Sequence, residues 1–172
     1  MDQALRILGL LIVGGLAMMA FAAAAVWWFT PARRIQRRLT KLLGGFPTVA
    51  ATAPARGAGA ALDAEGERIA TLTGFNDFGL VYELEELVGA ELIFDGQVAA
   101  RAFKGEGRRP LDQTAPDAQR VTLRLVFDDL REPEFELELW RAGDPPGGHD
   151  LASAVAEARR WFTHAEAVVR RA

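Results

Sequence analysis

Apolar and polar residues alternate over two segments in the second half of the chain, 121–127 and 135–139. Valine, leucine or phenylalanine occupies every second position, and residues such as Arg124 and Glu136 stand between them. A period of two places successive side chains on opposite faces of a strand, so each segment predicts a strand with one face on a core. Residues 128–133 (DDLREP) are typical of a turn, which would join the two strands into a hairpin.

Shorter apolar runs predict further strands at 68–75, 81–87, 90–94 and 97–104. The dipeptide Asp95-Gly96 between the last two is the strongest hairpin signal in the chain. Residues 105–119 and 141–148 are rich in glycine, proline and charged residues, so we expect loops there.

A helix is predicted at residues 151–170, because apolar side chains recur there at the spacing of one helical face. Asp150 would cap its start, and Arg170 and Arg171 would complement the dipole at its end. The apolar stripe consists of Leu151, Val155, Ala158, Phe162, Ala165 and Val169. Since one helix covers one side of a sheet, we expect an α+β fold: a small, bent antiparallel sheet closed by this C-terminal helix.

The beginning of the chain has a different pattern, because residues 7–29 contain no charge. A helix of that length crosses the roughly 30 Å hydrocarbon core of a bilayer, and Trp27 and Trp28 are typical of the membrane interface. We therefore predict a single transmembrane helix within an anchor at 1–30. The alternative is a cleaved signal peptide, which has a shorter apolar stretch preceded by its positive charges. Ala20 and Ala24 form a small-xxx-small pair that could pack on another helix.

Five basic residues and no acidic ones follow within residues 31–43: Arg33, Arg34, Arg37, Arg38 and Lys41. Because basic residues stay on the cytoplasmic side, they predict a single-pass inner-membrane protein with its N-terminus outside and its C-terminal domain in the cytoplasm. Ile35 and Leu39 share one side of a predicted juxtamembrane helix, with arginines opposite, so this helix would contact anionic lipid. The simpler interpretation is an orientation signal alone.

Residues 44–66 are rich in Ala, Gly, Pro and Thr, and they predict a flexible linker with little to bury. Residues 67–172 would then form the cytoplasmic domain. This part has 13 basic against 20 acidic residues, so nucleic acid is not expected as a partner. The chain has no cysteine, which excludes disulfides and thiolate chemistry.

Two stretches of the expected domain support a family resemblance. Residues 87–101 read LVGAELIFDGQVAAR, and residues 121–139 read VTLRLVFDDLREPEFELEL. Over about residues 80–170 the chain resembles the bacterial and prophage PH-like domain proteins of unknown function. The matching positions are Gly89, Glu91, Leu92, Asp95, Gly96, Asp129 and Pro133. The chain departs from the family at Glu132, where asparagine is frequent, and in the polar loop 105–119. The resemblance implies a PH-like fold and a binding or scaffolding role, and it supplies no catalytic residue.

Candidate chemistry is sparse. The only histidines, His149 and His164, are too far apart for a metal-ligand pattern, and we interpret them as solvated or capping residues. The carboxylates fall in turns or on the outer faces of strands, so we predict no catalytic residue, no metal site and no cofactor. Lys104, Arg108 and Arg109 lie in a glycine-containing loop that could contact a lipid phosphate or a partner, although the spacing of a phosphate-binding loop is absent.

Together these features favour a membrane-anchored, non-catalytic binding or scaffold module, such as an accessory subunit of a bacterial membrane protein complex. Its expected partners are the lipid bilayer and a protein in the membrane or at its cytoplasmic face. Two alternatives stay open: a sensor of anionic lipid surfaces that uses the basic helix, and an enzyme whose site carries no recognisable motif.

Overall fold

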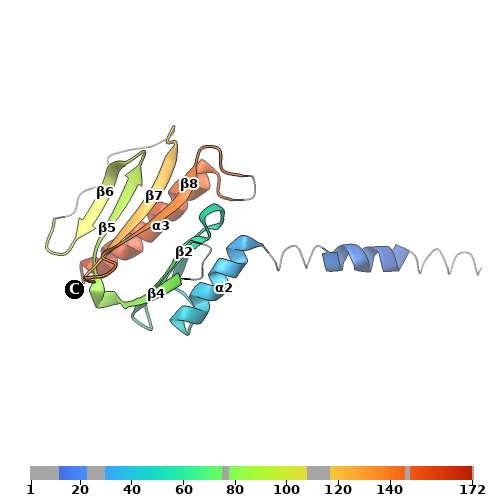
Figure 1. Cartoon of the computed structure of the whole chain (residues 1–172), viewed down its shortest axis with the longest axis horizontal. Coiled ribbons are helices and arrows are strands. Elements are labelled where there is room, and N and C mark those ends of the chain that lie inside the picture. Colours follow the sequence, from blue (N-terminus) through green and yellow to red (C-terminus); the bar gives the residue numbers. More distant parts are fainter. Residues whose placement is uncertain (1–11, 23–29, 75–77, 108–116, 146–147, 172) are drawn as a thin grey trace, which may run out of the picture.

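The structure, a computed structural model, describes residues 12–22, 30–74, 78–107, 117–145 and 148–171 (Figure 1). Its strands form two antiparallel sheets: sheet A in the order β1-β2-β3-β4, and sheet B in the order β6-β5-β7-β8. Sheet A contains β1 (Val49–Ala53), β2 (Ala58–Asp63), β3 (Arg68–Thr73) and β4 (Phe78–Glu83). Sheet B contains β5 (Leu87–Phe94), β6 (Gln97–Phe103), β7 (Arg120–Phe127) and β8 (Glu134–Arg141). The helices are α2 (Pro31–Leu43) and α3 (Leu151–Val169), with short 3-10 turns η1 (Pro54–Arg56) and η2 (Leu84–Glu86).

Sheet B contains the strands that the alternating pattern predicted. β7 and β8 pair antiparallel, with Leu123 opposite Leu137 and both side chains buried. Asp95 and Gly96 have φ angles of 52° and 83°, the left-handed conformation that a two-residue Asp-Gly hairpin requires. The predicted strands and hairpin of this half are therefore confirmed.

The hairpin β1–β2 occupies the segment for which we expected a flexible linker, 44–66, so that prediction is wrong. β1 and β2 pair from Val49↔Leu62 to Ala53↔Ala58, and Ala51 and Ala60 are fully buried. Small side chains predominate because sheet A is covered on both faces, and they allow the covering helices to approach closely. A Cβ on Gly59 would lie 2.7 Å from Cγ2 of Ile35, so glycine is required there.

Helix α2 packs on the outer face of sheet A. Pro31 stands in its first turn, and it ends at Gly44, whose φ of 73° is left-handed and whose N–H bonds to Thr40 O. The buried residues of α2 and their partners in sheet A are Ile35, Leu39, Leu43, Ala61, Ala70 and Leu72. The basic side chains lie on the opposite side of the helix, where most of them are exposed.

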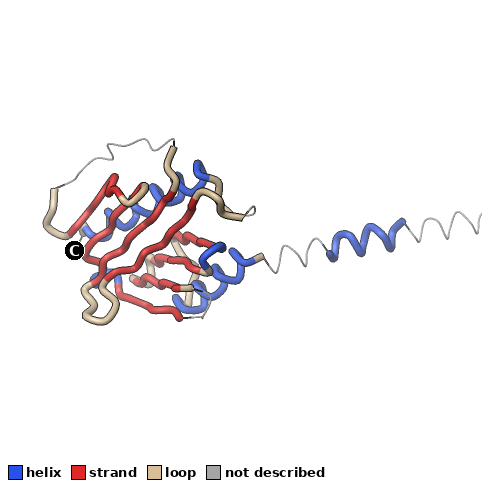
Figure 2. The backbone as a smooth tube through the Cα atoms, turned by 45° about the horizontal axis from the view of Figure 1, so that its top comes forward, coloured by secondary structure: helices blue, strands red, loops and turns tan. Residues whose placement is uncertain are grey.

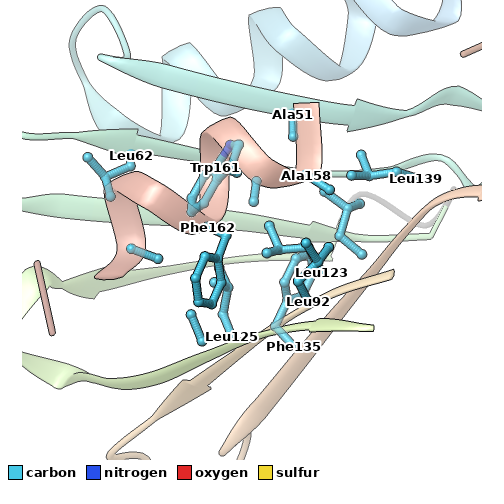
Figure 3. Packing of buried hydrophobic residues seen from close by; sticks show 14 of the residues in the cluster. Ala51, Leu62, Leu92, Leu123, Leu125, Phe135, Leu139, Ala158, Trp161 and Phe162 are labelled. Atoms are coloured by element: carbon cyan, nitrogen blue, oxygen red, sulfur yellow. The ribbon is translucent and has the colours of Figure 1, made fainter. Parts of the chain in front are cut away.

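Helix α3 lies between the two sheets. In Figure 3, Trp161 lies on the side toward Ala51 and Leu62 of sheet A, and Phe162 extends toward Leu125 of sheet B. Residues of α3 and of both sheets belong to one hydrophobic cluster. The predicted single bent, PH-like sheet closed by a helix is therefore wrong. The physical reason is that α3 is apolar on two sides, since Ala154 and Trp161 are buried in addition to the predicted stripe.

The two sheets are joined on both sides of α3. The edge strands β1 and β8 contact each other, and this contact is called the β1–β8 seam below. Elsewhere, Tyr82 of β4 stacks on Phe127 of β7 with ring centroids 3.9 Å apart, and its hydroxyl donates to Glu132 O at 3.2 Å. Figure 2 shows the strands of the two sheets running at an angle to each other.

Residues 12–22 are helical and fall within the segment that we expected to span a membrane. The rest of that segment, 7–11 and 23–29 with Trp27 and Trp28, lies outside the described residues. A helix over 12–22 extends about 17 Å, against roughly 30 Å for a hydrocarbon core. None of the described helices is both long and apolar enough to cross a membrane. This finding contradicts the predicted transmembrane helix and the single-pass inner-membrane location that depended on it.

Candidate functional site

A pocket of about 300 Å³ opens beside the β1–β8 seam. Its walls come from the start of α2, from η1 and from the loop between β8 and α3. The lining residues are Thr30, Pro31, Ala32, Pro54, Ala55, Leu139, Asp144, Pro145, Gly148 and His149. Most of this lining is apolar, and its three prolines have a fixed φ angle. The pocket therefore has stiff, largely apolar walls.

Arg56 organises a group of ion pairs beside this pocket. From the end of η1 its Nε donates to Glu138 Oε1 at 2.8 Å, and its Nη1 donates to Asp144 Oδ2 at 2.7 Å. Glu138 also accepts from Arg141 Nη2 at 2.6 Å, and Asp144 accepts from the Arg141 backbone N–H at 2.9 Å. The side chains of Arg56, Glu138 and Asp144 are only 18–23% exposed, so water screens these pairs only in part.

Burial and hydrogen bonding have opposite effects on the acids of this group. Desolvation raises the pKa of Glu138, but hydrogen bonds from Arg141 and Arg56 outweigh it, and the pKa lies below its ordinary value. The pKa of Asp144 is lowered in the same way: burial raises it, and the hydrogen bonds from Arg56 and from the Arg141 backbone, with the charges of both arginines, together outweigh burial. The pKa of Arg56 is raised, because its bonds to Asp144 and Glu138 outweigh desolvation. All three groups are therefore charged and held in place at neutral pH.

His149 forms another wall of the pocket and contacts a half-buried acid. Its Nε2 lies 3.0 Å from Thr52 O and 3.0 Å from Glu157 Oε2 on α3. Because a carbonyl oxygen only accepts hydrogen bonds, the tautomer with a proton on Nε2 fits both contacts. Burial raises the pKa of Glu157. The charges of His149 and Arg160 and a backbone hydrogen bond from Thr52 lower it, but burial outweighs them. His149 thus ties the loop to both β1 and α3, a role that its interpretation as a solvated or capping residue missed.

The two ionisable side chains of the pocket lining are already bonded within the protein. Asp144 is paired with Arg56, and His149 is bonded to Thr52 and Glu157. Among the described residues, no three His, Asp or Glu side chains come together in a set that could hold a metal ion. The surface left for a ligand is therefore mostly apolar, and it favours binding through shape and burial of apolar area.

The five basic residues that we predicted for a membrane interface do not line this pocket. The buried residues of α2 face sheet A, and the five basic residues lie elsewhere on the same helix: Arg33, Arg34, Arg37, Arg38 and Lys41. Trp27 and Trp28 lie outside the described residues. A contact of the α2 basic residues with anionic lipid stays a prediction.

Lys104 of the predicted partner loop does not line the pocket either. Lys104 Nζ donates to Glu85 O at 2.6 Å, which ties this residue to η2. Arg108 and Arg109 lie outside the described residues. The sequence had no signal for the pocket itself, because Pro31, Pro54 and Pro145 meet only through the contact of β1 with β8.

Two of the motif residues behind the family resemblance, Gly89 and Asp95, have structural roles here. A Cβ on Gly89 would lie 2.4 Å from Cε1 of Phe103 on the neighbouring strand, so glycine makes room for that ring. Asp95 Oδ1 accepts from the backbone N–H of Gln119 at 2.8 Å and of Arg120 at 2.7 Å. These contacts fix turns and packing, and neither residue lines the pocket.

The chain matches no family model, no curated protein and no solved structure. The resemblance to PH-like domain proteins therefore stays a prediction from these motifs.

Proposed function

We propose that this domain is a non-catalytic binding module that takes an aliphatic side chain of a protein partner into the pocket at the β1–β8 seam. The observation that carries the proposal is the apolar pocket of about 300 Å³ between proline-containing walls. Fixed ion pairs of Arg56 stand beside it. Apolar pockets bordered by polar groups are typical of the energetically important centres of protein interfaces.

The size of the pocket suits a side chain. Its volume is at the lower end of the range for small-molecule sites, roughly 300–1,000 Å³. Burying a leucine or isoleucine side chain contributes about 1.5–3 kcal/mol. Stiff walls reduce the entropy lost on binding. One side chain binds weakly, so we expect a partner to make further contacts with the charged groups beside the pocket.

Titration of the full chain with N-acetyl-leucinamide, followed by two-dimensional NMR, tests the pocket directly. From the burial energy of a leucine side chain we expect weak binding, with a Kd of roughly 5–80 mM, and shift changes at pocket residues such as Ala32, Ala55 and His149. N-acetyl-glycinamide, which lacks the side chain, should leave these signals unchanged.

Two tryptophan variants distinguish binding in this pocket from binding elsewhere on the protein. Ala55 is exposed on η1 at the pocket, so Ala55→Trp should fill the pocket and abolish the shifts. Ala167 is an exposed residue of α3 outside the pocket lining, so Ala167→Trp should leave them intact. No binding of the leucine amide, or binding that Ala55→Trp does not weaken, would contradict the proposal.

Selection of random displayed peptides distinguishes a protein partner from a free small molecule. Peptides enriched on the wild-type chain, but not on Ala55→Trp, should share an aliphatic residue. Binding of the leucine amide without any such peptides would indicate a small-molecule site.

A further inference from the structure

Strand β4 is a free edge of sheet A. Within the described strands it pairs with β3 alone. It is also the most exposed strand of the sheet, with Phe78 55% and Val81 42% exposed. In Figure 2 it lies at the lower border of the molecule.

The register shows which backbone groups this edge offers. Leu84 N donates to Glu67 O at 2.8 Å, and the pairing continues from Arg68↔Glu83 to Thr73↔Phe78. Hydrogen-bonded and non-bonded pairs alternate along an antiparallel ladder. The N–H and C=O groups of Gly79, Val81 and Glu83 therefore point away from β3. The N–H of Glu83 is bonded to Glu86 Oε2 at 2.7 Å, so pairing with another strand would exchange this acceptor.

The other sheet edges have more protection than β4, whose one charged residue, Glu83, is the last of the strand. β1 and β8 lie against each other at the seam. β6 carries the charged residue Arg101, and its pairing with β5 shifts register between Leu92 and Ile93. Bulges and charges on an edge oppose pairing with another chain. β4 has an unbroken register with β3, and its sequence, FGLVYE, has no proline and no basic residue.

We propose that β4 pairs antiparallel with β4 of a second copy, so that the two A sheets become one continuous sheet. The outward groups are symmetric about Val81. A two-fold axis there places Val81 opposite its counterpart, and Gly79 opposite Glu83 of the partner subunit. The same surface is then used by both copies, as in the closed dimers that are commonest among oligomers.

The side chains at this edge fit the proposed register. Opposed residues have their side chains on the same face of a sheet. A Cβ on Gly79 would lie 2.6 Å from Leu42 Cδ1, so Gly79 lies beneath the last turn of α2. Glu83 of the partner subunit would therefore approach this turn, which carries Lys41, in a helix without acidic residues. On the other face, Phe78 would be covered by the end of the opposing strand.

Charge variants at the two-fold axis test the proposal on the full chain by light scattering after size exclusion. We expect the wild type to have twice the chain mass of 18.7 kDa. Val81→Glu and Val81→Lys each place like charges opposite each other, so each variant alone should be monomeric. An equimolar mixture of the two should restore the dimer, because opposite charges then face each other.

Val98 provides the matched control. It is a valine on the edge strand β6 with a similar exposure of 47%, next to the register shift of that strand. Val98→Glu and Val98→Lys should remain dimeric.

A cysteine variant gives a readout that does not depend on charge. The chain has no cysteine, so Val81→Cys should form a disulfide-linked dimer on mild oxidation, since directly opposed residues lie within disulfide reach. Val98→Cys should stay uncrosslinked. A monomeric wild type at micromolar concentration, a Val81 pair that does not complement, or the absence of the Val81→Cys crosslink would overturn the proposal.

Discussion

Arg56 joins parts of the chain that are far apart in sequence. It follows two small residues in a segment without nearby acids, so the sequence offers no partner for it. The fold brings it to Glu138 on β8 and to Asp144 in the following loop. These bonds hold η1 against β8, and they support one wall of the pocket.

Glu138→Gln tests the importance of this contact. At neutral pH we expect the free energy of unfolding to fall by about 1–3 kcal/mol, because Arg56 and Arg141 lose a charged acceptor. The pKa of Glu138 is lowered in the folded protein, so its stabilisation is complete above the unfolded-state pKa and is lost as the pH falls through the folded-state pKa. Urea unfolding of wild type and variant at several pH values should therefore converge in acid.

Glu134→Gln is the control for this prediction. Glu134 is 58% exposed and lies 3.8 Å from Arg124 Nε, so we expect a loss under about 0.5 kcal/mol. Equal losses for the two variants would show that partial burial adds nothing at Glu138.

The sequence pattern of helix α2 is compatible with two roles, contact with a lipid surface and packing on a sheet. Its basic residues and apolar stripe are typical of a helix on a lipid surface. In the structure the same stripe completes the outer layer of sheet A, and Leu39 is fully buried there. The pocket also depends on α2, since Pro31 and Ala32 form part of its wall.

Leu39→Ala tests whether α2 belongs to the folded domain. We expect a loss of about 2–5 kcal/mol in the free energy of unfolding, because the change leaves a cavity between α2 and sheet A. Leu130→Ala makes the same chemical change at a fully exposed position and should have almost no effect. If denaturant unfolding of Leu39→Ala matched that of the wild type, α2 would not contribute to the core.

At the scale of the whole molecule, α3 makes the two sheets into one unit. Trp161 and Phe162 are consecutive, and they extend toward different sheets (Figure 3). Both belong to the hydrophobic cluster that contains Leu62 of sheet A and Leu125 of sheet B. We therefore expect the sheets to unfold together.

Phe162→Leu tests this cooperativity. The side chain extends toward sheet B, and the substitution should cost about 1 kcal/mol. Native-state hydrogen exchange should show the same loss of protection at Ala60 and Ala70 in sheet A as at Leu92 and Leu123 in sheet B. A loss confined to sheet B would show that the sheets unfold separately.

The sequence by itself determined the elements whose signals act between neighbouring residues. Alternation indicated β7 and β8, Asp95-Gly96 indicated the β5–β6 turn, and Asp150 caps α3 by accepting from Ser153 N at 2.7 Å. Each signal depends on backbone geometry within a few residues. Packing elsewhere in the molecule therefore did not alter these predictions.

Only the tertiary structure decided the β1–β2 hairpin, the place of α3 and the pocket. Alanine and glycine have little apolar surface of their own, so a segment rich in them is a linker or a tightly packed strand depending on what covers it. Here Ile35 and Leu39 of α2 pack within 3.1 Å of where a Cβ on Gly59 would stand. The pocket is equally non-local, because its walls meet only after β1 and β8 have come together.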